Sequence, residues 1–153
     1  EGPHGDFFLR EENPRPVILL AGGTGFAPVK ALVEHAFQQK SDRPMTLYWG
    51  ARDRSGLYLN ALAEGWAASH TEFRYVPVLS EPAAADAWSG RRGLVHRAVM
   101  EDFPDLSGHQ VYACGAPAMI EAARSDLITR CGLKEEAFFA DAFSFAADSL
   151  PVG

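Results

Sequence analysis

The sequence has few cysteines and no long apolar run. Its two cysteines, Cys114 and Cys131, stand apart without a CxxC pattern or paired histidines, so the sequence suggests neither a disulfide framework nor a metal site. The longest apolar runs, such as residues 17–21, are far shorter than the ~18 residues that a membrane-spanning helix needs. No charged-then-apolar signal segment opens the chain. We expect a cytoplasmic protein without a membrane span.

Basic residues are outnumbered by acidic ones. The chain has 14 lysines and arginines against 20 aspartates and glutamates, which gives a formal net charge of -6. Proteins that bind nucleic acids concentrate basic side chains on one face. The five histidines lie without metal-ligand spacing, and we expect them at the surface or at helix caps. Neither nucleic acid nor a metal is therefore an expected ligand.

The composition is that of one ordinary globular domain, with 153 residues of which 47% are hydrophobic. From Pro16 onward, short β-rich apolar runs alternate with longer segments of helical period, which is typical of βαβ units. The pattern predicts an α/β fold, a three-layer αβα sandwich with a five-stranded parallel sheet. The predicted strands are residues 17–21, 46–50, 73–79, 110–114 and 137–140, and the predicted helices lie at about 29–37, 57–68, 94–103 and 117–131.

Two helical details are also predicted. In the third helix, Leu94, Ala98 and Val99 are the expected inward-facing residues. Gly132 is expected to close the fourth helix, because glycine readily adopts the left-handed conformation that ends helices.

The first strand runs into a glycine-rich loop, Gly22-Gly23-Thr24-Gly25, that opens a helix. Backbone amides and the positive end of a helix favour a phosphate there, and glycines remove the side chains that would hold the ligand away. Thr24 can add a hydroxyl donor, and Pro28 suits the first helical turn. The alternative is a tight turn that binds nothing.

The loop differs from the common dinucleotide fingerprint. Pro28 stands where GxGxxG has its third glycine, and the second strand ends in Gly50-Ala51-Arg52 without an acidic residue for a ribose. The sequence therefore indicates another variant of nucleotide-binding domain.

Four strand-end motifs together resemble one family. They are GGTGFAP at 22–28, YWGAR at 48–52, CGAPAM at 114–119 and FFADAF at 138–143. In this order they resemble the pyridine-nucleotide domain of the ferredoxin–NADP reductase superfamily. The closest similarity is to NAD(P)H-dependent flavin and iron–sulfur reductases, including flavin reductases, oxygenase reductase components and the CDP-6-deoxyglucoseen reductase type.

The resemblance implies a division of the chain. Residues 1–10, with a GPxGxF-like segment at 2–7, are similar to the end of a FAD-binding barrel, the rest of which this sequence lacks. Residues 15–145 would form the NAD(P)-binding domain, and residues 146–153 a tail beyond the aromatic residue at which other family members stop. The chain is thus expected to be a fragment that is inactive alone.

The resemblance also assigns nucleotide-binding residues. Arg52 could bind a phosphate through its guanidinium, and an ion pair with Asp53 or Asp42 is the alternative. Glu81 would repel the 2′-phosphate of NADPH, which favours NADH. Arg91 and Arg92 lie in the same connection and keep NADPH open as an alternative to NADH. The predicted cofactor-binding residues are Gly22, Gly23, Thr24, Gly25, Pro28, Arg52, Ser80, Glu81, Gly115, Ala116, Pro117 and Met119.

Three residues are expected at the reacting ring. In the family, the cysteine equivalent to Cys114 touches the nicotinamide as an orienting group, whereas an inert buried thiol is the alternative reading. Asp141 would lie at the place of hydride transfer. Phe143 would cover the flavin ring and be displaced by the nicotinamide.

These features predict that the chain binds NADH and passes its hydride to FAD in a domain outside this sequence. Electrons would then reach an iron–sulfur centre elsewhere in the protein, an oxygenase or a deoxysugar enzyme. The alternatives are a free-flavin reductase, a nucleotide-binding module without redox chemistry, and a flavodoxin-like protein that binds FMN.

Overall fold

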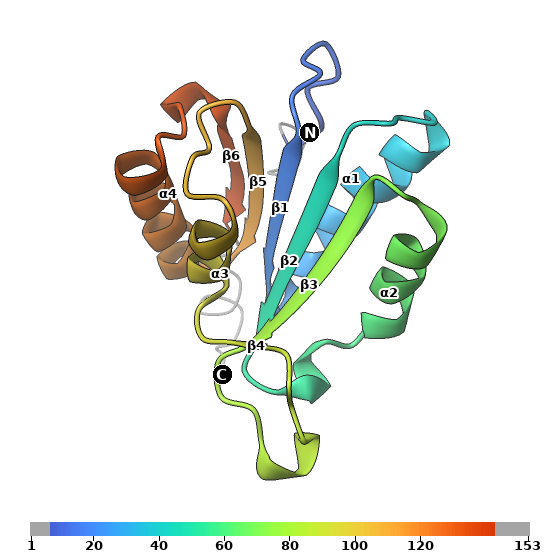
Figure 1. Cartoon of the computed structure of the whole chain (residues 1–153), viewed down its shortest axis with the longest axis vertical. Helices are drawn as coiled ribbons and strands as arrows, with labels where there is room; N and C mark the ends of the chain where they lie inside the picture. The colour runs from blue at the N-terminus through green and yellow to red at the C-terminus, as the bar shows by residue number, and fades with distance from the viewer. Residues whose placement is uncertain (1–6, 143–153) are drawn as a thin grey trace, which may run out of the picture.

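The computed structural model describes residues 7–142, which form one parallel sheet with helices on both faces (Figure 1). The strand order is β4-β3-β2-β1-β5-β6. The α/β three-layer prediction is therefore confirmed. The strands are β1 Val17–Gly22, β2 Met45–Ala51, β3 Phe73–Leu79, β4 Arg91–Arg92, β5 Gln110–Gly115 and β6 Phe138–Ala142.

The sheet has six strands, whereas the sequence predicted five. The additional strand, β4, has two residues and pairs with Val78 and Leu79 at the end of β3. Two arginines carry no apolar alternation, so the sequence pattern contains no signal for this strand. The last strand also starts one residue later than predicted and continues to Ala142.

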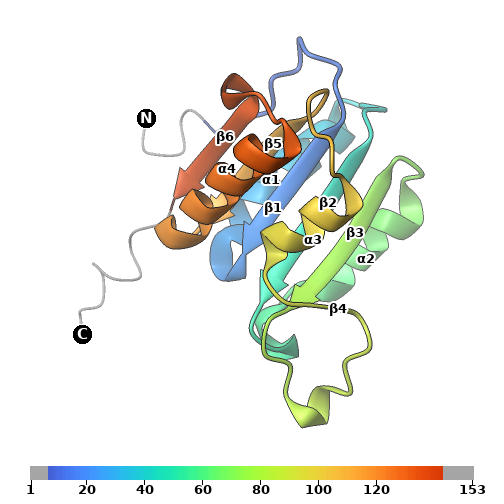
Figure 2. The same cartoon turned by 60° about the vertical axis from the view of Figure 1, so that its left-hand side comes forward.

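Two helices cover each face of the sheet (Figure 2). Helices α1 and α2 pack on one face around Leu19, Trp49 and Phe73, while α3 and α4 pack on the other around Ile18, Tyr48 and Val111. Successive residues of a strand point to opposite faces of the sheet, so alternate residues belong to the two cores. The helices are α1 Phe26–Gln38, α2 Asn60–Ser69, α3 Val95–Asp102 and α4 Pro117–Cys131.

The predictions for Leu94 and one histidine are wrong. Leu94 is 53% exposed, because α3 begins at Val95 and Leu94 has the extended backbone of a residue that precedes a helix. His96 is buried within α3 and pairs with Asp126 of α4 at 2.9 Å. Gly132 does end α4, with a left-handed φ of 73°, as predicted.

The chain changes direction between β1 and β5. The connections from β1 through β3 carry α1 and α2 on one face, and those through β5 and β6 carry α3 and α4 on the other. In open parallel sheets, ligands bind outside the carboxyl ends of the strands at such a switch point. Within residues 7–142, no helix is long and apolar enough to cross a membrane.

Candidate functional site

Three glycines lie side by side at the carboxyl ends of the central strands. Gly22 of β1 pairs with Gly50 of β2, and a Cβ on Gly115 of β5 would lie 3.5 Å from the Cα of Gly22. Added side chains would meet the helices, because a Cβ on Gly50 would lie 2.7 Å from the Cβ of Val95. A Cβ on Gly22 would lie 2.9 Å from Cε of Met119. The bare strand ends therefore let α3 and α4 approach the sheet closely.

The loop after β1 forms one 3-10 turn, Gly23–Gly25, that leads directly into α1. Gly23 has a φ of 54°, which glycine adopts without strain. A Cβ on Gly25 would lie 2.2 Å from the carbonyl oxygen of Cys114, so the main chains of the loop and of β5 touch. None of the described side chains caps the start of α1, which leaves its positive end available to an anion.

Aromatic residues hold this loop from behind. The indole of Trp49 donates a hydrogen bond to the carbonyl of Gly23 at 3.0 Å. Phe26, the first residue of α1, stacks on Trp49 with ring centroids 3.9 Å apart, and both side chains are fully buried. The core thus fixes the loop from one side, and Thr24 is its only exposed side chain.

Cys114 and Asp141 lie opposite each other on β5 and β6. Both are buried, with exposed fractions of 0% and 6%. Burial, and then the charge of Asp141, raise the pKa of the Cys114 thiol to about 12. The thiol is therefore protonated at neutral pH and is not a nucleophile, because only the thiolate attacks.

Tyr58 belongs to this region, although the sequence analysis did not select it. Its ring lies edge-on to Trp49 and Phe26, with centroids 5.3 and 6.2 Å away, and is 51% exposed. Burial, and then the nearby Cys114, raise the pKa of its hydroxyl. The sequence does show an aromatic residue before α2, which begins at Asn60. However, the predicted helix, residues 57–68, included Tyr58, so the residue was not recognised as part of a loop.

Arg52 and Glu81 form an ion pair at the ends of β2 and β3. The Nε–Oε1 distance is 3.6 Å, and the amide of Glu81 donates to the carbonyl of Arg52 at 2.8 Å. The partners suggested by the sequence were Asp53 and Asp42, and Asp53 instead accepts a hydrogen bond from Ser55. Both side chains of the pair are mostly exposed, so the pair contributes little to stability and can rearrange around a ligand.

Arg91 and Arg92, the reason for keeping NADPH as an alternative cofactor, are both bonded within the protein. Arg91 binds Asp102 at 2.9 Å and Glu101 at 2.7 Å, and Arg92 donates to the carbonyl of Trp88. Bonding to Asp102 raises the pKa of Arg91. The contacts of Arg91 join β4 to α3, whereas Arg92 stays exposed beside the end of β3.

The remaining predicted residues surround the glycine row. Thr24 is exposed on the 3-10 turn, Pro28 is the third residue of α1, and Ala116 and Pro117 are exposed where α4 starts. Phe143 lies outside the described residues. A pocket of about 170 Å³ joins the glycines to Ser80 and is lined by Gly22, Gly50, Ala51, Ser80, Gly93, Leu94, Val95 and Met119.

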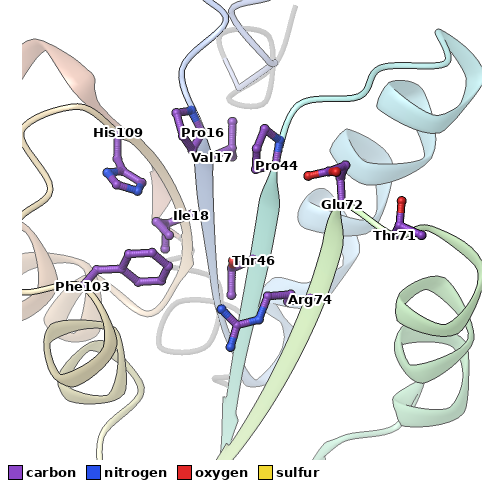
Figure 3. Close-up of a pocket in the computed structure, with 10 residues that line it drawn as sticks. All are labelled: Pro16, Val17, Ile18, Pro44, Thr46, Thr71, Glu72, Arg74, Phe103 and His109. Atoms are coloured by element: carbon purple, nitrogen blue, oxygen red, sulfur yellow. The ribbon is translucent and has the colours of Figure 1, made fainter.

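A larger pocket, of about 280 Å³, lies at the opposite end of the strands (Figure 3). Pro16, Ile18 and Phe103 give it apolar walls, and Thr46 and Arg74 lie beside each other on its floor. It contains none of the residues predicted to bind a nucleotide.

His109, in the wall of this pocket, predicts a pH dependence of stability. Burial lowers its pKa below the ordinary 6.5, against the opposing charge of Asp105, and its Nδ1 has no partner among the described residues. As pH falls below about 6.5, the unfolded chain gains a proton that the folded chain resists, so stability falls. Urea unfolding at pH 7 and at about pH 5.5 should show a smaller loss for His109→Phe than for the wild type. Equal losses would contradict this.

Comparison with known proteins places the chain in a family. The model of the oxidoreductase NAD-binding domain matches residues 19–125. Over 143 residues the chain is 50% identical to the CDP-6-deoxy-L-threo-D-glycero-4-hexulose-3-dehydrase reductase of Yersinia pestis, covering 94% of this chain and 42% of that protein. It is 38% identical over 145 residues to the NAD(P)H-flavin reductase of Aliivibrio fischeri, covering 95% and 60%.

A solved structure agrees with this placement. The cytochrome P450 reductase GcoB of Amycolatopsis matches with a TM-score of 0.82 and 33% identity, over 93% of this chain and 42% of that one. The chain spans less than two thirds of the length of each of these proteins. It belongs to the oxidoreductase NAD-binding domain family and has the ferredoxin reductase-like fold.

Proposed function

We propose that this chain binds NADH along the carboxyl ends of its strands and presents the nicotinamide ring at Cys114 and Asp141. The observation that carries the proposal is the contact between the main chains of Gly25 and Cys114. The contact brings an uncapped helix start, suited to a diphosphate, to the main chain of Cys114, and Asp141 is the neighbour of Cys114 on β6. A nucleotide held there would extend over the glycine row toward Arg52 and Glu81.

Each residue of the site has a distinct task in this proposal. Cys114 is neutral and small, so it can contact the ring without blocking the approach of the acceptor. The carboxylate of Asp141 favours the positive charge that the ring gains as hydride leaves, just as it opposes a negative charge on Cys114. The bound groups supply the chemistry itself, reduced nicotinamide as hydride donor and FAD as acceptor.

We further propose that FAD is carried by a flavin-binding barrel of the same protein, of which residues 1–10 form the end, with residues 15–145 as the nucleotide domain. The names of the relatives support a reductase that passes electrons on. They include a dehydrase reductase and a reductase component of terephthalate 1,2-dioxygenase in Comamonas. An iron–sulfur centre elsewhere in the protein would carry single electrons to such an acceptor. A cytoplasmic location is consistent with the two free, buried thiols.

A second candidate function is the reduction of free flavin. The flavin reductase of Aliivibrio fischeri supports it, because that protein is also similar over most of this chain. A purely nucleotide-sensing module is less well supported, since it has no use for a thiol and a carboxylate beside the ring.

Anaerobic stopped-flow mixing of the complete protein with NADH tests the redox proposal. We expect the bound flavin to be bleached and the chain alone to bind NADH weakly without reducing ferricyanide. A complete protein that binds NADH but contains no reducible flavin would contradict the proposal; reduction of added FMN or FAD would then favour the free-flavin reductase, and no such reduction would favour the sensing module.

Glu81→Ala should shift the nucleotide preference from NADH toward NADPH. The change removes the charge that repels a 2′-phosphate and frees Arg52 from its ion pair, so kcat/KM for NADPH should rise by about tenfold, or ~1.4 kcal/mol. The matched control, Glu34→Ala, breaks the Lys30–Glu34 pair on α1. It should change kcat/KM for neither NADH nor NADPH. An unchanged NADPH value in Glu81→Ala would remove this role from Glu81.

A further inference from the structure

The segment before β1, residues 7–16, is bound along β5 and β6, and we call it the strap. Two of its apolar side chains, Phe7 and Leu9, are 9% and 6% exposed and belong to the core on the α1 and α2 face, whereas Phe8 between them is 51% exposed. Phe7 lies edge-on to Tyr112 of β5 with centroids 6.2 Å apart. Helix α1 packs on β1 and β5 of this face and helix α2 packs on β3, so the strap extends the same layer toward β6.

Arg43, just before β2, fastens the strap at two points. Its Nε donates to the carbonyl of Arg15 at 3.0 Å, and its Nη1 donates to the carbonyl of Arg10 at 3.3 Å. The third donor, Nη2, binds the side chain of Gln110 at 3.0 Å. A planar guanidinium can satisfy three acceptors in one fixed geometry, which lysine cannot do. Arg43 thus connects the strap to the first residue of β5.

Tyr112 adds a second fastening. Its hydroxyl accepts a hydrogen bond from the amide of Arg10 at 2.8 Å and donates to Gln110 at 2.9 Å. The ring of Tyr112 is fully buried and stacks on Phe139 of β6 with centroids 4.8 Å apart. The guanidinium of Arg10 lies 4.4 Å from the centre of the Phe139 ring, so the strap contacts both strands.

The residues that the strap contacts on β5 and β6 lie two positions before Cys114 and Asp141. Tyr112 pairs with Phe139, and two residues further along the same strands Cys114 pairs with Asp141. Residues two apart on a strand face the same side of the sheet. The strap is therefore fixed to the same-face pair that precedes the proposed place of hydride transfer.

We propose that Arg43 is a positioning residue that makes the strap a rigid part of the nucleotide domain. This rests on the proposed function, in which the flavin domain ends with residues 1–10 and so runs into the first residues of the strap. A strap fixed against β5 and β6 sets the distance between that domain and Cys114, and any pivot between the domains lies before Phe7. Hydride transfer is sensitive to such a distance, since a misplacement of about 1 Å can reduce a rate by ~100-fold.

The test compares Arg43→Ala and Arg43→Lys in the complete protein. Arg43→Ala should slow flavin reduction at saturating NADH by about tenfold and leave the Kd for NADH within about twofold, because the glycine loop lies at the other end of β1. Arg43→Lys should recover part of the rate. Arg124→Ala, which breaks an exposed pair with Glu135, is the matched control and should behave as the wild type.

Hydrogen–deuterium exchange gives a readout that does not depend on flavin. In Arg43→Ala the amides of residues 8–16 should exchange faster while those of α1 stay unchanged. Unchanged exchange would show that Arg43 does not hold the strap, and faster exchange with an unchanged rate would show that the strap does not position the domains. If Arg43→Ala does not fold, Tyr112→Phe should give the same pattern more weakly, and its absence would overturn the proposal. A wild-type protein without reducible flavin would refute the proposed function itself. Hydrogen–deuterium exchange at residues 8–16 would still show whether Arg43 holds the strap.

Discussion

Gly25→Ala is expected to abolish detectable NADH binding and to lower the free energy of unfolding by about 1–3 kcal/mol. The new Cβ would lie 2.2 Å from the carbonyl oxygen of Cys114 and 2.6 Å from its carbonyl carbon. Both are main-chain atoms of β5, so no rotamer change relieves the clash and the loop must move away from the strand. Urea unfolding and a titration of NADH fluorescence measure the two effects.

Gly65→Ala is the matched control for this substitution. Gly65 lies within α2, and a Cβ there would meet no heavy atom within 4 Å. Since alanine is the better helix former, the control should gain up to about 1 kcal/mol and bind NADH as the wild type does. If Gly25→Ala bound NADH with an unchanged Kd, the nucleotide would not use this corner.

Cys114→Ala should slow flavin reduction in the complete protein by about 10- to 100-fold at saturating NADH, with little change in the Kd for NADH. Cys114 is the register partner of Asp141, and its main chain contacts the Gly25 loop. In the proposed function its thiol only orients the ring, so its loss should lower the rate of transfer rather than binding. Because burial and Asp141 raise its pKa to about 12, no step from Cys114 should appear in the pH profile between about pH 6 and 9. Single-turnover stopped-flow gives both results.

The other cysteine provides the comparison. Cys131 is also buried, but it ends α4, and burial raises its pKa as well. Cys131→Ala should therefore lower stability, as loss of a buried group does, and leave the rate of flavin reduction unchanged. Equal rate losses in the two variants would mean that Cys114 acts only through packing.

Much of the fold could be predicted from the sequence because the central strands are short, mostly apolar segments separated by segments of helical period. Strand β3 was predicted at its observed bounds, and Gly132 marked the end of α4 correctly. The errors lie where local pattern carries no signal. Arg91 and Arg92 form a strand only because folding brings them beside Val78 and Leu79, which are not their neighbours in the sequence. Leu94 has an apolar side chain that the start of α3 leaves outside the core.

The site shows the same division between local and tertiary information. Gly22 and Gly115 stand out in the sequence, but only the sheet register places them next to each other. The family resemblance predicted Cys114 and Asp141 at one ring, whereas their pairing on β5 and β6 and the place of Tyr58 near Cys114 depend on contacts that no spacing predicts. The partner of Arg52 was missed for the same reason, since Glu81 reaches it from the neighbouring strand.

An NMR titration of this chain with NADH tests the central claim most directly, because the two pockets lie at opposite ends of the sheet. The account predicts that the amide signals of Gly23, Thr24, Gly25 and Gly115 shift together, while those of Thr46 and Arg74 in the other pocket (Figure 3) stay in place. Shifts that gather instead at Thr46 and Arg74, with the glycine signals unmoved, would contradict it.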